Sequence, residues 1–312
     1  MMRHDKILVT GGSSMVGKHL QKIIPEAIYL SSKDCDLMNL AEVKKIIEKV
    51  KPTNVIHLAA KVGGIMDNIK NPVNFFEENI YINTNLVKAC FENRVNNITS
   101  ILSTCIFPDK VKEEDYPMKE SLLHEGPPTP TNFAYGYAKR CLAVQSKIYN
   151  EQYGTKYSTL TPCNLYSEHD HFEGDKAHFI SSLIKKIYVA KKENNPSIDL
   201  FGSGKPLRQF MYAGDLANAI CETLDESEVF EYNIANKENY SIKEMAEIGL
   251  EACDAKNIEI NWDKSKPDGQ YRKDASSKKF TDKYPEFEFT SLKEGIKKVF
   301  CLKYGNEKLE VK

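Results

Sequence analysis

The sequence has no apolar run long enough to cross a bilayer and no excess of charge of either sign. Its 312 residues carry 43 Lys and Arg side chains against 44 Asp and Glu, a formal net charge of −1. A balanced charge of this kind argues against binding to nucleic acid or a membrane through a bulk electrostatic field. Residues Met1 to Lys6 lead directly into an apolar segment and do not resemble a signal peptide. We therefore expect a cytoplasmic protein with neither partner.

Closely spaced cysteine pairs are also absent, and arginine is scarce. No CxxC motif occurs, so neither a disulfide framework nor a zinc site is expected, and most thiols should be reduced core residues. The cysteines are residues 35, 90, 105, 141, 163, 221, 253 and 301. Any anion must be bound by local groups, and the available arginines are Arg3, Arg94, Arg140, Arg208 and Arg272.

Short apolar runs alternate with segments of helical periodicity through the first half of the chain. The pattern predicts strands at 6–10, 27–30, 54–60, 98–104 and 157–162, and helices at about 16–24, 41–51, 75–93 and 135–153. Strands that alternate with helices indicate a parallel sheet covered on both faces. We therefore predict an α/β, Rossmann-type doubly wound fold.

This alternation stops near residue 165. Polar and proline-containing loops then surround predicted helices at 179–191, 215–224 and 241–255. We predict a dinucleotide-binding domain over 1–165, with a returning segment near 206–236, and a smaller substrate-binding region over 166–312.

A glycine-rich turn follows the first predicted strand and opens the first helix. At this place in a Rossmann fold, helix amides and close backbone approach bind a dinucleotide pyrophosphate. The pattern departs from GxxGxxG at Ser14, which suits the turn if its φ is negative and its hydroxyl faces the phosphate. The predicted cofactor contacts here are Gly11, Gly12, Ser13, Ser14, Met15, Val16 and Gly17.

The residues after the second strand indicate which dinucleotide binds. An NAD site places Asp or Glu there to hold the ribose 2′-hydroxyl, whereas this chain has Ser31-Ser32-Lys33. The hydroxyl of Ser32 and the ammonium of Lys33 suit a 2′-phosphate, which favours NADP, and Asp36 with Leu37 could hold the adenine. The alternative for Lys33 is an ordinary solvated lysine.

A Tyr-x-x-x-Lys pair suggests reductive chemistry. The spacing occurs three times, but only Tyr135/Lys139 opens a helix about thirty residues after a strand that ends in a serine, Ser103. Residues four apart share a helix face. Lys139 could therefore lower the Tyr135 pKa while it binds the nicotinamide ribose. Ser103 could bond a substrate carbonyl to which Tyr135 gives a proton.

At this point the chain resembles the extended short-chain dehydrogenases/reductases, and among them the GDP-L-fucose synthases. The Ser-Thr-Cys-Ile-Phe-Pro segment is more specific than the Tyr-Lys pair. The similar stretches are Ile7–Gly17, His57–Ala60, Val62–Gly64, Leu102–Pro108, Asn132–Arg140, Pro162–Tyr166, Phe201–Phe210 and Lys266–Lys273. The resemblance implies a 3,5-epimerase/4-reductase acting on a GDP-linked 4-keto-6-deoxy sugar with NADPH.

The resemblance also implies roles for individual residues. Cys105, which alone would be interpreted as a buried strand thiol, becomes the epimerisation base, and His178 becomes the acid and a cofactor contact. Further cofactor contacts are Ala59, Ala60, Pro162, Asn164 and Leu165. The substrate contacts are Lys186, Phe201 in place of a usual tryptophan, Arg208 and Asp268.

Two features near these residues leave alternatives open. The segment Glu168-His169-Asp170-His171 looks like a metal cluster, but the chemistry needs no metal, and we interpret it as a polar loop over the site. The family pattern has Gly-Pro where this chain has Ser167-Glu168. For Arg208, the alternative is a salt bridge to a helix carboxylate.

Two other functions compete with the implied one. A reductase or epimerase of the same fold could act on another sugar, such as a GDP-keto-heptose, and a non-catalytic NADP-binding sensor could share the fold. The family resemblance further implies a homodimer formed by the helices at 75–93 and 135–153.

Overall fold

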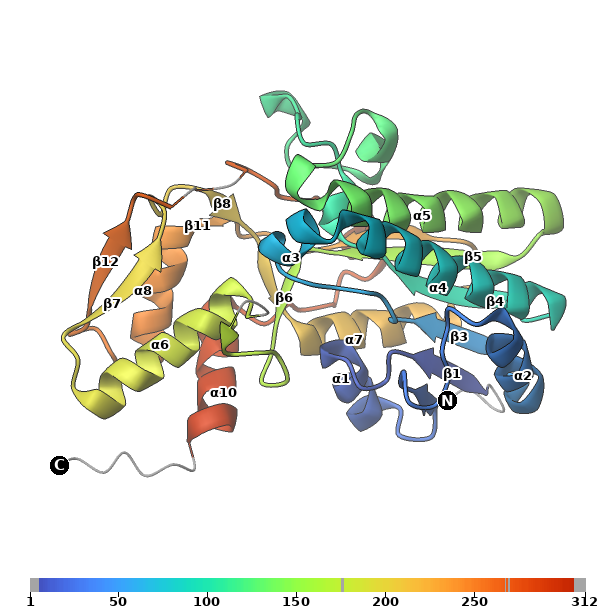
Figure 1. Cartoon of the computed structure of the whole chain (residues 1–312), viewed down its shortest axis with the longest axis horizontal. Coiled ribbons are helices and arrows are strands. Elements are labelled where there is room, and N and C mark those ends of the chain that lie inside the picture. Colours follow the sequence, from blue (N-terminus) through green and yellow to red (C-terminus); the bar gives the residue numbers. More distant parts are fainter. Residues whose placement is uncertain (1–5, 175–176, 267, 269, 306–312) are drawn as a thin grey trace.

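The computed structural model describes residues 6–174, 177–266, 268 and 270–305. A larger α/β part lies beside a smaller part that contains α6 (Phe179–Glu193), α8 (Ile242–Ala252) and α10 (Leu292–Tyr304) (Figure 1). None of the described helices has the length and apolar character needed to span a membrane.

Six parallel strands form the central sheet of the larger part, in the order β10-β5-β4-β3-β1-β2. The chain leaves β1 toward β2 and then crosses to β3 on the other side of β1. The strand order therefore reverses between β1 and β3, where doubly wound folds bind their ligands. This confirms the predicted fold class. The strands are β1 (Ile7–Thr10), β2 (Ile28–Leu30), β3 (Asn54–His57), β4 (Asn97–Ile101), β5 (Lys156–Pro162) and β10 (Glu231–Ile234).

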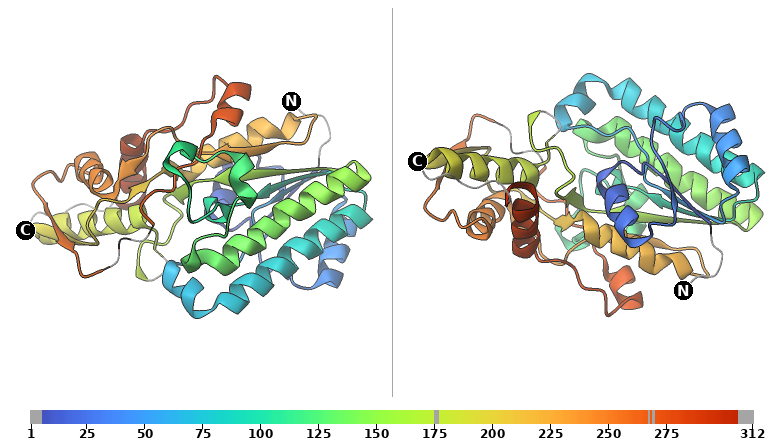
Figure 2. Two further views of the ribbon diagram at one scale, coloured as in Figure 1. Left: turned by 90° about the horizontal axis from the view of Figure 1, so that it is seen from above. Right: turned by 90° about the horizontal axis from the view of Figure 1, so that it is seen from below.

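Helices cover both faces of this sheet because neighbouring strand residues point to opposite sides. Leu8 packs into the core beneath one helical layer, whereas Val9 packs into the core of the other. The two layers are seen from above and below in Figure 2. One contains α2 (Leu40–Val50), α4 (Pro72–Glu92) and α5 (Phe133–Tyr153), and the other α1 (Met15–Ile23), α7 (Ala213–Glu222) and α9 (Lys278–Lys283).

The smaller part has a hydrophobic core of its own. Ile184, Met245 and Ile296, from its three helices, are fully buried together. A parallel pair, β7 (Ser197–Phe201) with β12 (Glu259–Asp263), packs beside them. Between residues 213 and 234 the chain returns to the large sheet as α7 and β10. A domain boundary near residue 165 stays a prediction.

The remaining elements are short. They are α3 (Ile65–Lys70), the strand pairs β6 (Asn164–Tyr166) with β9 (Phe210–Tyr212) and β8 (Leu207–Arg208) with β11 (Tyr240–Ser241), and the 3-10 helices η1 (Thr104–Ile106), η2 (Glu113–Asp115), η3 (Glu120–His124), η4 (Pro130–Asn132) and η6 (Thr223–Asp225).

Two predicted strands are too long. The strand predicted at 54–60 ends at His57, and the one predicted at 98–104 ends at Ile101. Ser103 is not part of the strand but caps η1, because its Oγ accepts the Cys105 N–H. Cys105 therefore lies in a turn after the strand. The sequence pattern also did not reveal β7, β10, β12 or α10.

Gly11 allows the turn after β1 to approach the segment after β3, at the place where the strand order reverses. Its φ is +71°, and a Cβ built on it would lie 2.8 Å from the Ala59 backbone nitrogen. Gly154 has a similar φ of +69°, but a Cβ there would meet nothing within 4 Å. The two glycines thus share a backbone conformation and differ in crowding.

We expect Gly154→Ala to lower the free energy of unfolding by about 1 kcal/mol, the cost of a left-handed L-residue. Gly11→Ala should lower it by a further ~1–3 kcal/mol, because the added carbon overlaps the backbone of Leu58 and Ala59, just after β3. Urea denaturation of both variants measures the difference. Equal losses would show that the strands do not need the close approach.

Candidate active site

The glycine-rich turn has the geometry expected of a pyrophosphate site. Gly17 lies against the turn, since a Cβ built on it would be 2.5 Å from the Gly12 carbonyl oxygen. Ser14 caps α1 with a φ of −69°, and its Oγ accepts the Gly17 N–H at 3.1 Å. This capping uses an oxygen lone pair and leaves the hydroxyl hydrogen as a donor for an anion. Serine is therefore compatible with the turn.

The end of β2 has no carboxylate directed toward a ribose. Asp34 is the nearest acidic residue, and its Oδ2 accepts hydrogen bonds from the Ser31 N–H at 2.8 Å and the Ser31 Oγ at 2.6 Å. These bonds lower the Asp34 pKa. Ser32 and Lys33 are exposed beside it.

Tyr135 and Lys139 lie on α5, which begins against η1. A Cβ built on Gly136 would lie 2.7 Å from the Cys105 carbonyl oxygen, so only glycine allows this contact. Lys139 is fully buried, and its Nζ donates to the Ile101 carbonyl at the end of β4 over 2.8 Å. Burial lowers the Lys139 pKa to about 8.

The prediction that Lys139 lowers the Tyr135 pKa is wrong for this structure. Burial, and then the negative charge of a Cys105 thiolate, raise the Tyr135 pKa above its ordinary value. The phenol is therefore neutral over the physiological range. A neutral phenol is the form that can donate a proton.

Cys105 is placed between two nitrogen donors. Its Sγ accepts hydrogen bonds from the Asn132 Nδ2 at 3.3 Å and the Lys273 Nζ at 3.2 Å. Burial alone would raise the thiol pKa. The Lys273 charge, together with hydrogen bonds from Ser103, Lys273 and Asn132, outweighs burial and lowers the pKa. A partly exposed thiol with a lowered pKa is a reactive one.

Lys273 is held in this position by contacts that the sequence did not reveal. The buried Gln209 side chain accepts the Ala275 N–H at 2.8 Å and donates to the Ala275 carbonyl at 3.1 Å. Arg272 donates to both oxygens of Asp274, at 2.6 and 3.0 Å. The stretch 266–273 is similar to the family, but nothing in its pattern pointed to Cys105.

His178 lies apart from this cluster, immediately before α6. Its Nδ1 is 3.0 Å from both carboxylate oxygens of Asp170, and more than half of its side chain is exposed. The hydrogen bond that His178 donates to Asp170 raises the His178 pKa, against the smaller effect of burial. His178 is therefore a stronger base than an ordinary histidine and carries more charge at neutral pH.

The side chains of the segment 168–171 do not form one cluster, because His169 pairs with Glu168 at 3.5 Å whereas Asp170 pairs with His178. Glu168 and His169 instead meet His19 of α1, with ligand atoms within 4.8 Å of one another, the only such group among the described residues. Glu168 also accepts from the Tyr212 OH at 3.0 Å and lies 3.4 Å from the Lys22 Nζ. A neighbouring ammonium disfavours a divalent cation. We interpret the group as a polar contact that joins α1 to this loop.

The predicted substrate residues line the smaller part and its junction with the sheet. Phe201 is exposed, with the Lys186 and Lys266 ammonium groups 5.3 and 5.8 Å from its ring centre. Asp268 accepts from the Ser203 N–H at 2.6 Å and Oγ at 2.7 Å. These side chains give an aromatic face bordered by cations and a carboxylate.

Arg208 is available for an anion. Its NH1 donates to the carbonyls of Leu207, at 2.7 Å, and Tyr271, at 3.4 Å. No carboxylate within the described ranges forms an ion pair with it, so a salt bridge to a helix carboxylate is not found. The Asn164 Nδ2 donates to the adjacent Gln209 carbonyl at 2.9 Å, which joins β6 to this segment.

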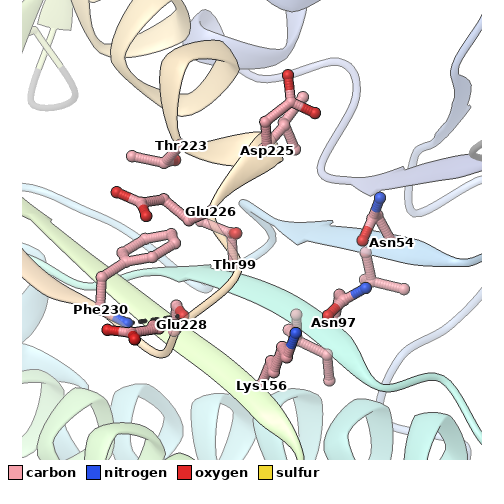
Figure 3. A pocket seen from close by; sticks show the side chains of 13 residues that line it. Asn54, Asn97, Thr99, Lys156, Thr223, Asp225, Glu226, Glu228 and Phe230 are labelled. Carbon is pink, nitrogen blue, oxygen red and sulfur yellow. Dashed lines mark hydrogen bonds between the residues drawn. The ribbon is translucent and has the colours of Figure 1, made fainter. Parts of the chain in front are cut away.

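A separate polar pocket lies at the opposite end of the sheet (Figure 3). It is lined by residues at the amino ends of β3, β4 and β5, including Asn54, Asn97 and Lys156, and by Asp225 and Glu226. The chemistry described above is at the carboxyl ends of the strands, where parallel α/β sheets bind ligands. This pocket is therefore not the active site.

The chain is similar to known proteins over most of its length. The model of the NAD dependent epimerase/dehydratase family matches residues 7–235. The chain belongs to this epimerase/dehydratase family. It is 42% identical over 301 residues to the GDP-L-fucose synthase of Dictyostelium discoideum, covering 93% of this chain and 92% of that protein.

Two further members of the epimerase/dehydratase family are similar over nearly their whole length. A probable GDP-L-fucose synthase of Drosophila melanogaster is 39% identical, covering 93% of this chain and 94% of its own. A solved GDP-L-fucose synthetase of Naegleria fowleri bound to NADP superposes with a TM-score of 0.85 at 36% identity, covering 97% and 94%. The similarity therefore includes both parts of the structure.

We expect Lys273→Met to raise the Cys105 pKa by about 1–3 units, because the substitution removes the charge that favours the thiolate. Alkylation by iodoacetamide at neutral pH should slow accordingly, and its pH profile should move to higher pH. The measurement uses a background in which the exposed Cys141 and Cys301 are serine. An unchanged profile would show that Lys273 does not act on the thiol.

Proposed function

We propose that this enzyme converts GDP-4-keto-6-deoxy-D-mannose to GDP-L-fucose as a 3,5-epimerase/4-reductase that uses NADPH. The observation that carries the proposal is the Cys105 thiol, which accepts hydrogen bonds from Asn132 and Lys273 and is adjacent to Tyr135. A plain reductase has no use for an activated thiol there. The 42% identity to a GDP-L-fucose synthase supports the same activity.

The residues at the carboxyl ends of β1 and β2 fit NADPH. The turn Gly11–Gly17, with the Ser14 hydroxyl, would bind the pyrophosphate, and Ser32 with Lys33 would bind the 2′-phosphate. When bound, NADPH supplies the hydride that reduces C4. The remaining contacts would come from Asp36, Leu37, Ala59, Ala60, Lys139, Pro162, Asn164, Leu165 and His178.

Ser103, Tyr135 and Lys139 carry the reduction. Ser103 and Tyr135 hold the C4 carbonyl oxygen, and Tyr135 gives it a proton as the carbon is reduced. The raised Tyr135 pKa keeps the phenol protonated until that step. Lys139, charged at neutral pH despite burial, would bind the nicotinamide ribose.

Cys105 and His178 carry the epimerisation. The C4 carbonyl acidifies the hydrogens on C3 and C5, so a thiolate can remove a proton from one face. His178 gives a proton to the same carbon on the other face, which inverts the centre. Each inversion leaves a thiol and a neutral imidazole, and solvent restores both for the second carbon.

The smaller part holds the nucleotide. Arg208 and Lys186 bind the diphosphate, and arginine does so with two parallel hydrogen bonds. Phe201 packs on the base and Asp268 accepts hydrogen bonds from the nucleotide.

Two copies of the chain associate through α4 and α5 in this proposal. Both helices leave large apolar side chains exposed, which on a monomer mark an interaction surface. They are Val73, Phe76, Tyr81, Phe133, Val144, Ile148 and Tyr153. Sedimentation equilibrium tests the dimer. The eight free cysteines favour a reducing compartment such as the cytoplasm.

The proposal is tested by supplying GDP-4-keto-6-deoxy-D-mannose and NADPH in D2O. We expect NADPH oxidation at its absorbance band and a product with deuterium at C3 and C5, identified by NMR as GDP-L-fucose. Tyr135→Phe should slow reduction about 10²–10⁴-fold, and Cys105→Ala should abolish the deuterium exchange. NADPH oxidation without inverted C3 and C5 would favour a reductase of another keto sugar, and no turnover would refute the proposal.

We expect Lys33→Ala to weaken NADPH binding about ten-fold, because it removes a charged partner of the 2′-phosphate, while NADH binding stays the same. Calorimetric titration with NADPH and with NADH measures the two dissociation constants and their ratio. The matched control is Lys51→Ala, an exposed lysine just after α2. An equal loss for both cofactors would contradict the assignment.

A further inference from the structure

Asp170 is a buried carboxylate that none of the proposed catalytic steps uses. Only 2% of its side chain is exposed. Its Oδ2 accepts a hydrogen bond from the Ser181 Oγ at 2.5 Å, and its Oδ1 accepts one from the His171 N–H at 2.8 Å. Burying a charged carboxylate is costly unless it is hydrogen-bonded in this way. These bonds fix the orientation of the carboxylate.

The third partner of this carboxylate is the His178 ring. Both Asp170 oxygens lie 3.0 Å from Nδ1, so Nδ1 carries the hydrogen that is shared with them. The bond fixes the ring orientation and leaves Nε2 as the nitrogen that can present a proton to a ligand. Because more than half of the His178 side chain is exposed, Nε2 can also exchange protons with solvent.

The loop that carries Asp170 is itself tied to the larger part. Ser167, which replaces the family's glycine, accepts the His169 N–H with its Oγ at 3.0 Å, and its carbonyl accepts the Asp170 N–H at 3.1 Å. The His19 Nε2 of α1 lies 3.0 Å from the same Oγ. Asp170 therefore has a fixed position relative to α1, the helix that opens the cofactor site.

We propose that Asp170 is the positioning residue of the epimerisation acid: it fixes the His178 ring so that Nε2–H faces the substrate, and its charge keeps that ring protonated. This deepens the proposed function and rests on it. One proton is transferred in this step: it leaves Nε2 for the sugar carbon, while the Nδ1 hydrogen stays between the ring and Asp170. The two carboxylate oxygens beside Nδ1 stabilise the charge on the ring before transfer.

Asp170→Asn tests the proposal, with Glu173→Gln as the matched control. Glu173 is an exposed carboxylate that pairs with Lys185 of α6 at 2.8 Å and does not contact His178. Both substitutions remove one negative charge near the start of α6. Only Asp170→Asn should lower the His178 pKa, by about one to two units, measured by NMR of histidine-labelled protein.

The kinetic readout is solvent deuterium exchange at C3 and C5 of the keto sugar, measured on the enzyme with its cofactor. Asp170→Asn should slow exchange about 10–100-fold at neutral pH, with less loss at low pH where the ring is protonated anyway. NADPH affinity should stay unchanged. Glu173→Gln should exchange at the rate of the unsubstituted protein.

The two proposals can fail separately. If the unsubstituted enzyme neither exchanges deuterium nor oxidises NADPH, the proposed function is wrong, and the His178 pKa still tests the coupling to Asp170. If it does exchange, and Asp170→Asn leaves both the rate and the pKa unchanged, the role of Asp170 is overturned. Should Asp170→Asn not fold, a His178 pKa at or below 6.5 in the unsubstituted protein would equally overturn it.

Discussion

The contact between the Cys105 thiol and the Lys273 ammonium is the interaction on which the proposed chemistry depends. The two residues are 168 positions apart in the chain and their side chains are 3.2 Å apart in the structure. A thiol in a half-buried turn would otherwise stay protonated, because burial penalises its charge. The ammonium and the Asn132 amide reverse that penalty. The same site thereby holds a thiol that ionises readily and a phenol, Tyr135, that does not.

The backbone brings the Tyr135 phenol and the Cys105 thiol to one place. Parallel strands end at the same edge of the sheet, so the residues that follow β1, β3 and β4 lie near one another. Gly11 allows β3 to approach the first turn, and Gly136 allows the start of α5 to reach the Cys105 carbonyl. Lys139 then anchors this helix to the end of β4 through the Ile101 carbonyl. Two glycines and one buried lysine thus determine where the phenol and the thiol meet.

The smaller part contributes through loops that are held by buried polar side chains. Gln209 follows Arg208 and forms two hydrogen bonds with the Ala275 backbone, so it links the segment of Arg208 to the segment of Lys273. Polar contacts among His19, Glu168 and Tyr212 hold the loop before α6 against α1. Because these bonds are shielded from water, each is costly to break. Cys105 and His178 are therefore held by different parts of the chain.

The amino-acid sequence by itself determined the alternating α/β architecture, the position of the glycine turn and the pairing of Tyr135 with Lys139. These follow from local periodicity and from i, i+4 geometry, which neighbouring residues specify. Through resemblance it also indicated Cys105 and His178. Only the tertiary structure decided that Lys273, Asn132 and Asp170 act on these two groups, that the Tyr135 pKa rises, and that His19 meets Glu168. The reason is physical: a pKa and a hydrogen-bond partner depend on burial and on charges a few ångströms away, and the residues that supply them are distant in the chain.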